Sequence, residues 1–85
     1  MKIYKYPLTQ TRTNIEMPLQ SRVLCVQMQN DIPTVWAMIG NEGIKMNRTF
    51  VLIPTGFSTG TLNLDYIGTV QHLDGIVFHV FEIVE

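Results

Sequence analysis

The last eleven residues, GIVFHVFEIVE (75–85), form an almost continuous hydrophobic run with one histidine at its centre. In an extended strand, Val77 and Phe81 point to one side, and Phe78 and Val80 point to the other. A strand that is hydrophobic on both faces has to be covered on both faces. We therefore expect either a sandwich that closes over this strand or a second copy of the protein that packs against it.

Short β-rich runs recur along the chain and are separated by turn residues. The pattern predicts further strands over residues 2–6, 14–17, 21–29, 34–39, 46–53 and 62–70. Proline, glycine and an Asn-Asp pair lie between these runs, and no window of a dozen residues holds a helical period. We expect a single β domain over residues 1–85. Its predicted fold is all-β, a small antiparallel β-sandwich or barrel-like fold of six to seven short strands with little or no helix.

Alternation within the strands predicts which side chains point inward. In the third predicted strand, Leu24, Val26 and Met28 are expected to face the core. Trp36, in the next strand, is expected to join them there. The NDIP sequence at 30–33 predicts a turn that joins these two strands into an antiparallel hairpin.

The composition adds an expectation of self-association. Of the 85 residues 46% are hydrophobic, but only 15% are charged, where about 25% is typical. A small protein with few charges has difficulty covering its hydrophobic surface. We therefore expect a homo-oligomer, with a compact monomer as the alternative.

Charge and cysteine content argue against several classes of function. The net charge of −1 argues against a surface for long nucleic acids, although it leaves room for a local site for one anion. The single cysteine, Cys25, excludes an internal disulfide framework and fits a reducing compartment. No stretch reaches the roughly 18–20 hydrophobic residues of a membrane span, and the first residues lack a signal peptide's hydrophobic core. We expect a soluble cytoplasmic protein that does not engage membranes.

The residues that most often carry catalysis are few. His72 and His79 are the only histidines, and a metal site needs three or four close ligands. Cys25 lies in mid-strand, where a free cysteine behaves as a small hydrophobic residue. No nucleophile elbow, phosphate-binding P-loop or paired-carboxylate pattern occurs. We predict no catalytic residues, no metal and no cofactor, and hence no enzyme. His79 is expected to be a structural histidine of the core or an interface, and His72 an exposed turn residue.

One loop has the composition of a binding site. PTGFSTGT (54–61) combines two glycines, which allow backbone N–H groups to converge on an anion, with four hydroxyl residues that add donors. Arginines at strand starts suit phosphate recognition, and aromatic side chains could stack on a base. An ordinary hairpin loop is the alternative. The predicted ligand-binding residues are Arg22, Arg48, Thr55, Gly56, Phe57, Ser58, Thr59, Gly60, Thr61 and Tyr66.

A series of short motifs follows in order along the chain. They are IYKYPL (3–8), IEMP (15–18), LCVQMQ (24–29), VWAMI (35–39), RTF (48–50), PTG (54–56), YIGTV (66–70) and VFHVFE (77–82). With them the chain resembles, nearly end to end, a family of short proteins of unknown function encoded by bacteriophages and prophages. It departs from that family in a shortened segment at 40–47. The resemblance implies a viral origin and a small β fold, and it supplies no characterised catalytic residue.

Two functions from different classes fit these observations. The first is a non-enzymatic accessory protein, acting in the host cytoplasm, that counters host antiviral defence. It would sequester a small anionic nucleotide signal between subunits or block a host defence protein. The second is a structural or assembly component of the virion that acts only through protein–protein contacts. Melting experiments with nucleotides and analysis of purified virions separate the two.

Overall fold

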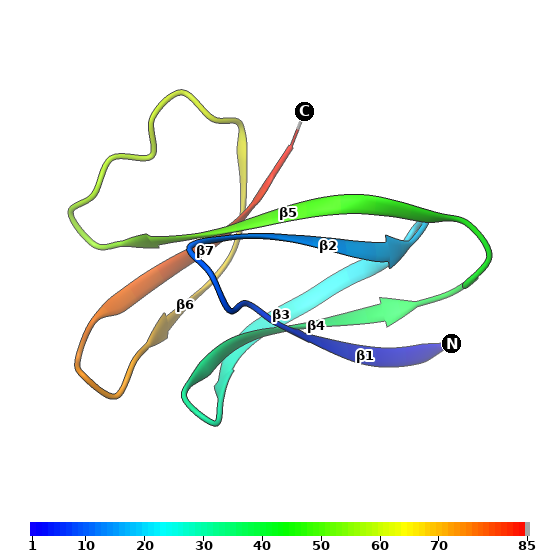
Figure 1. The fold of residues 1–85 in the computed structure, drawn as a ribbon, viewed down its shortest axis with the longest axis horizontal. Helices are drawn as coiled ribbons and strands as arrows, with labels where there is room; N and C mark the ends of the chain where they lie inside the picture. The colour runs from blue at the N-terminus through cyan, green and yellow to red at the C-terminus, as the bar shows by residue number, and fades with distance from the viewer. Residues whose placement is uncertain (85) are drawn as a thin grey trace.

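The computed structural model describes residues 1–84, which form seven strands and no helix (Figure 1). The strands are β1 (Lys2–Pro7), β2 (Arg12–Pro18), β3 (Arg22–Gln29), β4 (Ile32–Ile39), β5 (Lys45–Pro54), β6 (Leu64–Gln71) and β7 (Val77–Ile83). They make a three-stranded sheet, in the order β1-β4-β3, and a four-stranded sheet, in the order β2-β5-β7-β6. Every pairing is antiparallel. The predicted all-β, sandwich-like fold is confirmed.

The predicted strands overlap the observed ones, and their ends differ by at most two residues. The hairpin predicted at 30–33 is confirmed, with a tighter turn than expected. Gln29 pairs with Ile32, so only Asn30 and Asp31 form the loop. Both have positive φ, 50° and 61°, which matches the twist of a two-residue hairpin and is tolerated by Asn and Asp.

The core lies between the two sheets. Val35 and Ile39 of β4, Phe50 of β5 and Val80 of β7 are at most 1% exposed. Burial of such a side chain stabilises the fold by about 1.5–3 kcal/mol. The molecule measures only 17 Å along its shortest axis, which accommodates two sheets about 10 Å apart and no third layer. Each strand therefore has one face toward the core and one face away from it. Val51 of β5, which pairs with Phe81 on the outer face, is nevertheless only 6% exposed.

The final strand, β7, is covered completely on its inner side only. Val80 is 0% exposed, and Phe78 packs against the core. On the other side, Val77, Phe81 and Ile83 are half-buried. Phe81 makes an edge contact with a tyrosine of β6, at a ring-centroid distance of 5.6 Å. Glu85, the last residue of the predicted run, lies outside the described residues.

The prediction that Leu24 faces the core is wrong. A β-bulge shifts the register of β3 between Val23 and Cys25. As a result Val23 and Val26 both turn inward, as does Met28, and Leu24 is left 41% exposed. The extra residue of a bulge interrupts simple alternation, and nothing in the local sequence marks it.

The prediction that Trp36 lies in the core is also wrong. Its neighbours on β4, Val35 and Ala37, are both 0% exposed on the inner face. Successive side chains of a strand point to opposite faces, so the indole lies on the outer face of the three-stranded sheet, where it is half-buried.

One long side of the sandwich is closed by β3 against β6, where the two sheets approach each other closely. A Cβ atom added to Gly68 of β6 would lie 2.8 Å from Cγ1 of Val26. Glycine is therefore required at this position, because any side chain would push the two sheets apart.

Candidate functional site

Four side chains form a row of hydrogen bonds on the outer face of the four-stranded sheet. Thr55 Oγ1 lies 2.7 Å from His79 Nε2, and His79 Nδ1 lies 3.1 Å from Thr69 Oγ1. Tyr66 OH lies 2.6 Å from the same threonine oxygen. The antiparallel register creates the row, because Thr69 of β6 pairs directly with His79 of β7. We call Thr55, Tyr66, Thr69 and His79 the polar row.

The polar row always has one hydroxyl proton left over. A neutral imidazole donates from one nitrogen and accepts at the other, while a hydroxyl can do both. If Thr55 donates to His79, the bonds run toward Tyr66, whose proton remains free. If Tyr66 donates instead, the bonds run the other way and the Thr55 proton remains free. If Thr69 accepts from both His79 and Tyr66, its own proton remains free. In each arrangement one hydroxyl of the row can donate to an acceptor such as a phosphate oxygen.

The predicted binding loop, 54–61, begins at the Thr55 end of the polar row. Phe57 N–H donates to the carbonyl of Pro54 at 3.1 Å, forming a turn in which Gly56 has a φ of 91°. Gly60 N–H donates to the hydroxyl of Ser58 at 3.0 Å. Residues 55–61 are all exposed. The loop thus provides accessible hydroxyls, but the Gly60 N–H is already satisfied within it.

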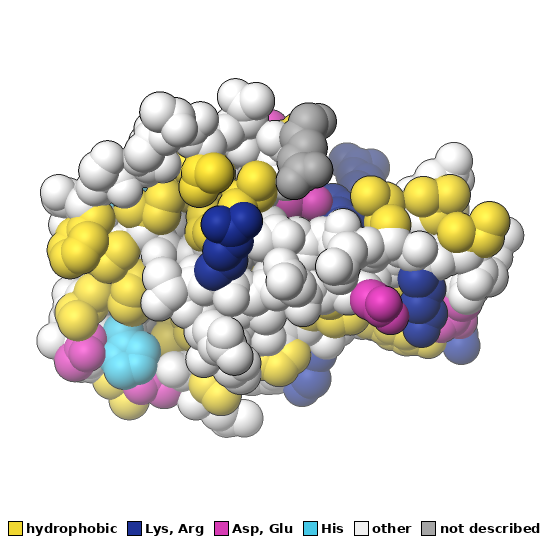
Figure 2. Space-filling model, turned by 45° about the horizontal axis from the view of Figure 1, so that its top comes forward, with side chains coloured by type: hydrophobic (Ala, Val, Ile, Leu, Met, Phe, Trp, Pro, Cys, Tyr) yellow, Lys and Arg dark blue, Asp and Glu magenta, His cyan; other side chains and the backbone are white. Residues whose placement is uncertain are grey.

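A hollow of about 270 Å³ lies between this loop and strands β2 and β5. Phe57, which is 70% exposed, and Leu62 line it together with Arg12. Arg12 forms no ion pair with another residue in the described part of the chain. Figure 2 shows hydrophobic side chains gathered at this end of the molecule, with charged side chains scattered rather than in one patch.

Arg48, a predicted phosphate-binding residue, is engaged within the protein. Its Nε and Nη2 donate to the two carboxylate oxygens of Glu82 at 2.6 and 2.7 Å, and its Nη1 donates to the carbonyl of Ser21. The two side chains are only 15% and 17% exposed. The hydrogen bonds with Glu82 raise the pKa of the Arg48 guanidinium above its ordinary value. A phosphate would have to compete with this bidentate carboxylate.

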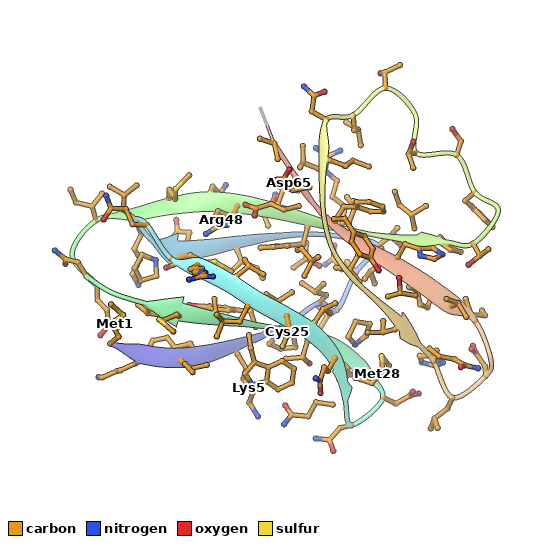
Figure 3. The ribbon with its side chains drawn as sticks, turned by 180° about the vertical axis from the view of Figure 1, so that it is seen from behind. Met1, Lys5, Cys25, Met28, Arg48 and Asp65 are labelled. Carbon is orange, nitrogen blue, oxygen red and sulfur yellow. The ribbon has the colours of Figure 1, made fainter. Side chains whose placement is uncertain are left out.

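The structure brings part of the predicted set together in a cleft of about 530 Å³ between β3 and β6. Arg22, Arg48 and Tyr66 line it, as do two carboxylates, Asp65 and Glu82. Figure 3 shows Arg48 and Asp65 close together at this place. The two arginines are therefore balanced by two acids. The loop residues Thr55, Gly56, Phe57, Ser58, Thr59, Gly60 and Thr61 do not line this cleft, and only Tyr66 is shared by the cleft and the polar row.

His79, Thr69 and Arg12 are residues that the sequence prediction did not select. His79 is satisfied by side-chain partners, as expected of a structural histidine, but it lies outside the core. The signal for its position was available, since His79 alternates with the inward Val80. Arg12 was missed because β2 begins two residues before the predicted strand.

His72 is not simply an exposed turn residue. Its side chain is 33% exposed, and Nε2 lies 2.9 Å from a carboxylate oxygen of Asp31 in the β3–β4 turn. Nδ1 lies 3.1 Å from the carboxylate of Asp74. Asp74 also accepts from the N–H of Ile76 at 2.9 Å. That bond, followed by the contacts with His72, holds the pKa of Asp74 below its ordinary value.

Residues 1–84 contain no group of three His, Cys, Asp or Glu side chains placed to bind a metal ion. The same residues contain no helix that could cross a membrane. No curated protein and no solved structure matches the chain. One family model matches, over residues 1–85, and it describes a domain of unknown function. The chain therefore belongs to the DUF7352 family.

Proposed function

We propose that this protein is a non-enzymatic binding module of phage origin that counters host antiviral defence by sequestering a nucleotide-derived signal in the host cytoplasm. The polar row carries the proposal, because it has a free hydroxyl proton and no carboxylate among its members. The phage origin rests on the ordered motifs that resemble phage and prophage proteins.

The surroundings of the polar row suit a ligand that combines phosphate and base. Phosphate oxygens accept hydrogen bonds, and the free hydroxyl proton lies at Thr55, Thr69 or Tyr66. Phe57 and Tyr66, 70% and 62% exposed, offer aromatic rings on which a base could stack. Arg12 supplies a cation at the loop end of the row.

The same geometry supports binding rather than catalysis. Thr55 and His79 have the separation of a nucleophile and its base, but the group behind the imidazole is the hydroxyl of Thr69. A hydroxyl does not stabilise an imidazolium as a carboxylate does. Thr55 is also exposed, so water has free access to it. Sequestration needs affinity and copy number but no bond cleavage.

We also propose that the module works as a homo-oligomer. The outer side of β7 presents Val77, Phe81 and Ile83, which are half-buried with no third layer over them. A second copy would complete their burial. Light scattering should give a mass above 9.7 kDa for the wild type and a smaller mass for Phe81→Asp. If both are monomers of equal size, the oligomer proposal is wrong.

A melting experiment tests the ligand. We expect cyclic dinucleotides, cyclic trinucleotides or ADP-ribose derivatives to stabilise the protein, by about 2.7 kcal/mol at a hundred times the dissociation constant. His79→Ala and Thr55→Val break the polar row and should reduce this shift. Thr49→Val is the matched control, because Thr49 lies on β5, which ends just before Thr55, and bonds to Asn14 instead of the polar row. This variant should bind as the wild type does. If His79→Ala melts with an unchanged ligand shift, the polar row is not the site.

In the two alternative functions the protein acts only through contacts with other proteins. It either blocks a host defence protein or is a structural part of the virion. The feature that favours them is the exposure of large hydrophobic side chains such as Leu73 (87%) and Ile44 (69%). No stabilisation by any nucleotide, together with presence of the protein in purified virions, would favour the structural role.

A further inference from the structure

The outer face of the three-stranded sheet has an arrangement that neither the family nor the polar row accounts for. Two neighbouring rows of outward side chains cross the strand order β1, β4, β3: Lys5, Trp36 and Cys25, then Ile3, Met38 and Arg22. We call these six residues the tryptophan face. Cross-strand neighbours on one face have Cβ atoms about 5 Å apart, and diagonal neighbours are about 7–8 Å apart.

Trp36 is at the middle of its row, with Lys5 on one side and Cys25 on the other. Figure 3 shows Lys5 and Cys25 on the same side of this sheet. The indole is half-buried and stacks on no other aromatic ring of the described residues. Ile3, on the neighbouring row, is 58% exposed. The β1 edge of the face is therefore exposed, and the large aromatic ring at its centre is half-buried.

The charge on the tryptophan face is of one sign. Lys5 Nζ reaches across β4 to the side-chain oxygen of Gln29 at 2.9 Å, which is a neutral partner. Within residues 1–84, Arg22 forms no ion pair. Two acids, Asp65 and Glu82, line the same cleft as Arg22. None of the six residues is acidic, so the face is cationic although the whole chain has a net charge of −1.

We infer that the tryptophan face binds a nucleoside phosphate, with the base stacked on Trp36 and the phosphate held by Lys5 and Arg22. Base stacking on an aromatic ring beside cationic side chains is how sheet surfaces hold unpaired bases. Lys5 lies beside Trp36 in its row, and Arg22 lies diagonally from Trp36 in the neighbouring row. The inference does not rest on the proposed function, because the polar row is on the other sheet.

The phosphate-bearing base could come from a free nucleotide or from a single strand of nucleic acid, and two probes separate these sources. AMP represents the free nucleotide, and a short oligoadenylate represents the strand. Tighter binding of the oligoadenylate, with a steep salt dependence, would identify the strand. Equal binding of both would identify one nucleotide as the whole ligand. An acidic peptide, such as oligoglutamate, serves as the charge-matched comparison without a base.

The chain offers two reporters at this face. Trp36 is the only tryptophan and Cys25 the only cysteine. Stacking of a base should quench the fluorescence of Trp36, and the quenching should saturate as the ligand concentration rises. The emission is excited at the red edge of tryptophan absorption. The same ligand should slow the reaction of Cys25 with a thiol reagent. N-acetyltryptophanamide controls for collisional quenching, and Thr49→Val, on the other sheet, should be quenched as the wild type is.

Variants assign the contacts, with affinity measured by the anisotropy of a labelled oligoadenylate. Trp36→Ala should weaken binding by about tenfold to a hundredfold, and Trp36→Phe by less. Lys5→Gln and Arg22→Gln should each lower the salt slope by about 0.7. Asp65→Asn should strengthen binding, because it removes a carboxylate from the cleft beside Arg22. Lys45→Gln, which removes an exposed cation from β5 of the other sheet, is the matched control and should change neither affinity nor slope.

Saturable quenching with protection of Cys25 supports the inference if the protection of Cys25 and the affinity for the labelled oligoadenylate both fall in folded Trp36→Ala and in the Lys5 and Arg22 variants. Quenching by oligoglutamate and not by either nucleotide probe would overturn it and assign the face to an acidic protein segment. No saturable change with any probe would overturn it as well. Melting curves confirm that each variant is folded.

Discussion

The ion pair between Arg48 and Glu82 should contribute to folding rather than to ligand binding, and Glu82→Gln isolates that contribution. The side chains are joined by contacts of 2.6 and 2.7 Å and are only 15% and 17% exposed. Removing one partner of a fully buried pair costs about 3–5 kcal/mol. Because the two side chains are partly exposed, water screens the Arg48 charge that Glu82→Gln leaves unpaired. We therefore expect the free energy of unfolding to fall by about 2–4 kcal/mol.

Urea unfolding, followed by the emission of Trp36, measures this loss, which corresponds to a Tm lower by roughly 10–25 °C. Arg48→Met should cost a similar amount, because it leaves the Glu82 carboxylate without its partner. The double variant Arg48→Met/Glu82→Leu should recover most of the stability, since hydrophobic residues of similar size can replace a buried pair. The control is Arg12→Met, whose effect should stay within about 0.5 kcal/mol.

A loss of less than about 0.5 kcal/mol in both single variants would refute this reasoning. The guanidinium would then be free to engage a ligand. In that case Arg48→Ala would weaken nucleotide binding without lowering the Tm, which is the behaviour expected if Arg48 grips a phosphate.

Two other substitutions test packing and pH dependence. Gly68→Ala should lower the free energy of unfolding, measured in urea, by about 1–3 kcal/mol, because the new methyl group meets the stiff side chain of Val26. Adding Val26→Ala should restore part of that free energy. If the losses of the two single variants simply add in the double variant, the contact is contradicted. In the folded state the pKa of Asp74 lies below its ordinary value of 3.8. The ionised Asp74 therefore stabilises the fold fully at pH values above 3.8, and this stabilisation is lost as the pH falls through the lower, folded-state pKa. Thermal melts across this acid range should fall less steeply for Asp74→Asn than for the wild type, and parallel curves would remove Asp74 from the pH dependence.

The fold could be predicted because its signal is periodic and local. Alternation and turn residues placed all seven strands, and the Asn30-Asp31 turn placed one hairpin. What sequence could not supply is anything that depends on pairing. The bulge that exposes Leu24 is visible only in the pairing of β3 with β4. The outward position of Trp36 follows from which face of β4 meets the other sheet.

The candidate site was predictable only in part for the same reason. Composition selected the loop at 54–61 and Tyr66, which begin and end the polar row. His79 became part of that row through the register of β7 against β6, which no local pattern encodes. Arg48 looked available because its partner, Glu82, is 34 residues away. Sequence patterns find donors and acceptors, but they do not reveal which ones are already satisfied.

The contact between Asp31 and His72 has a consequence for the order of folding. Only β3–β4 and β6–β7 pair strands that follow each other in sequence, so these two hairpins are the units that can form before any long loop closes. Asp31 and His72 are at their tips, and the contact therefore exists only once the hairpins have docked. His72→Ala should consequently speed unfolding and leave the refolding rate almost unchanged. A slower refolding rate with an almost unchanged unfolding rate would instead place the docking of the two sheets early in folding.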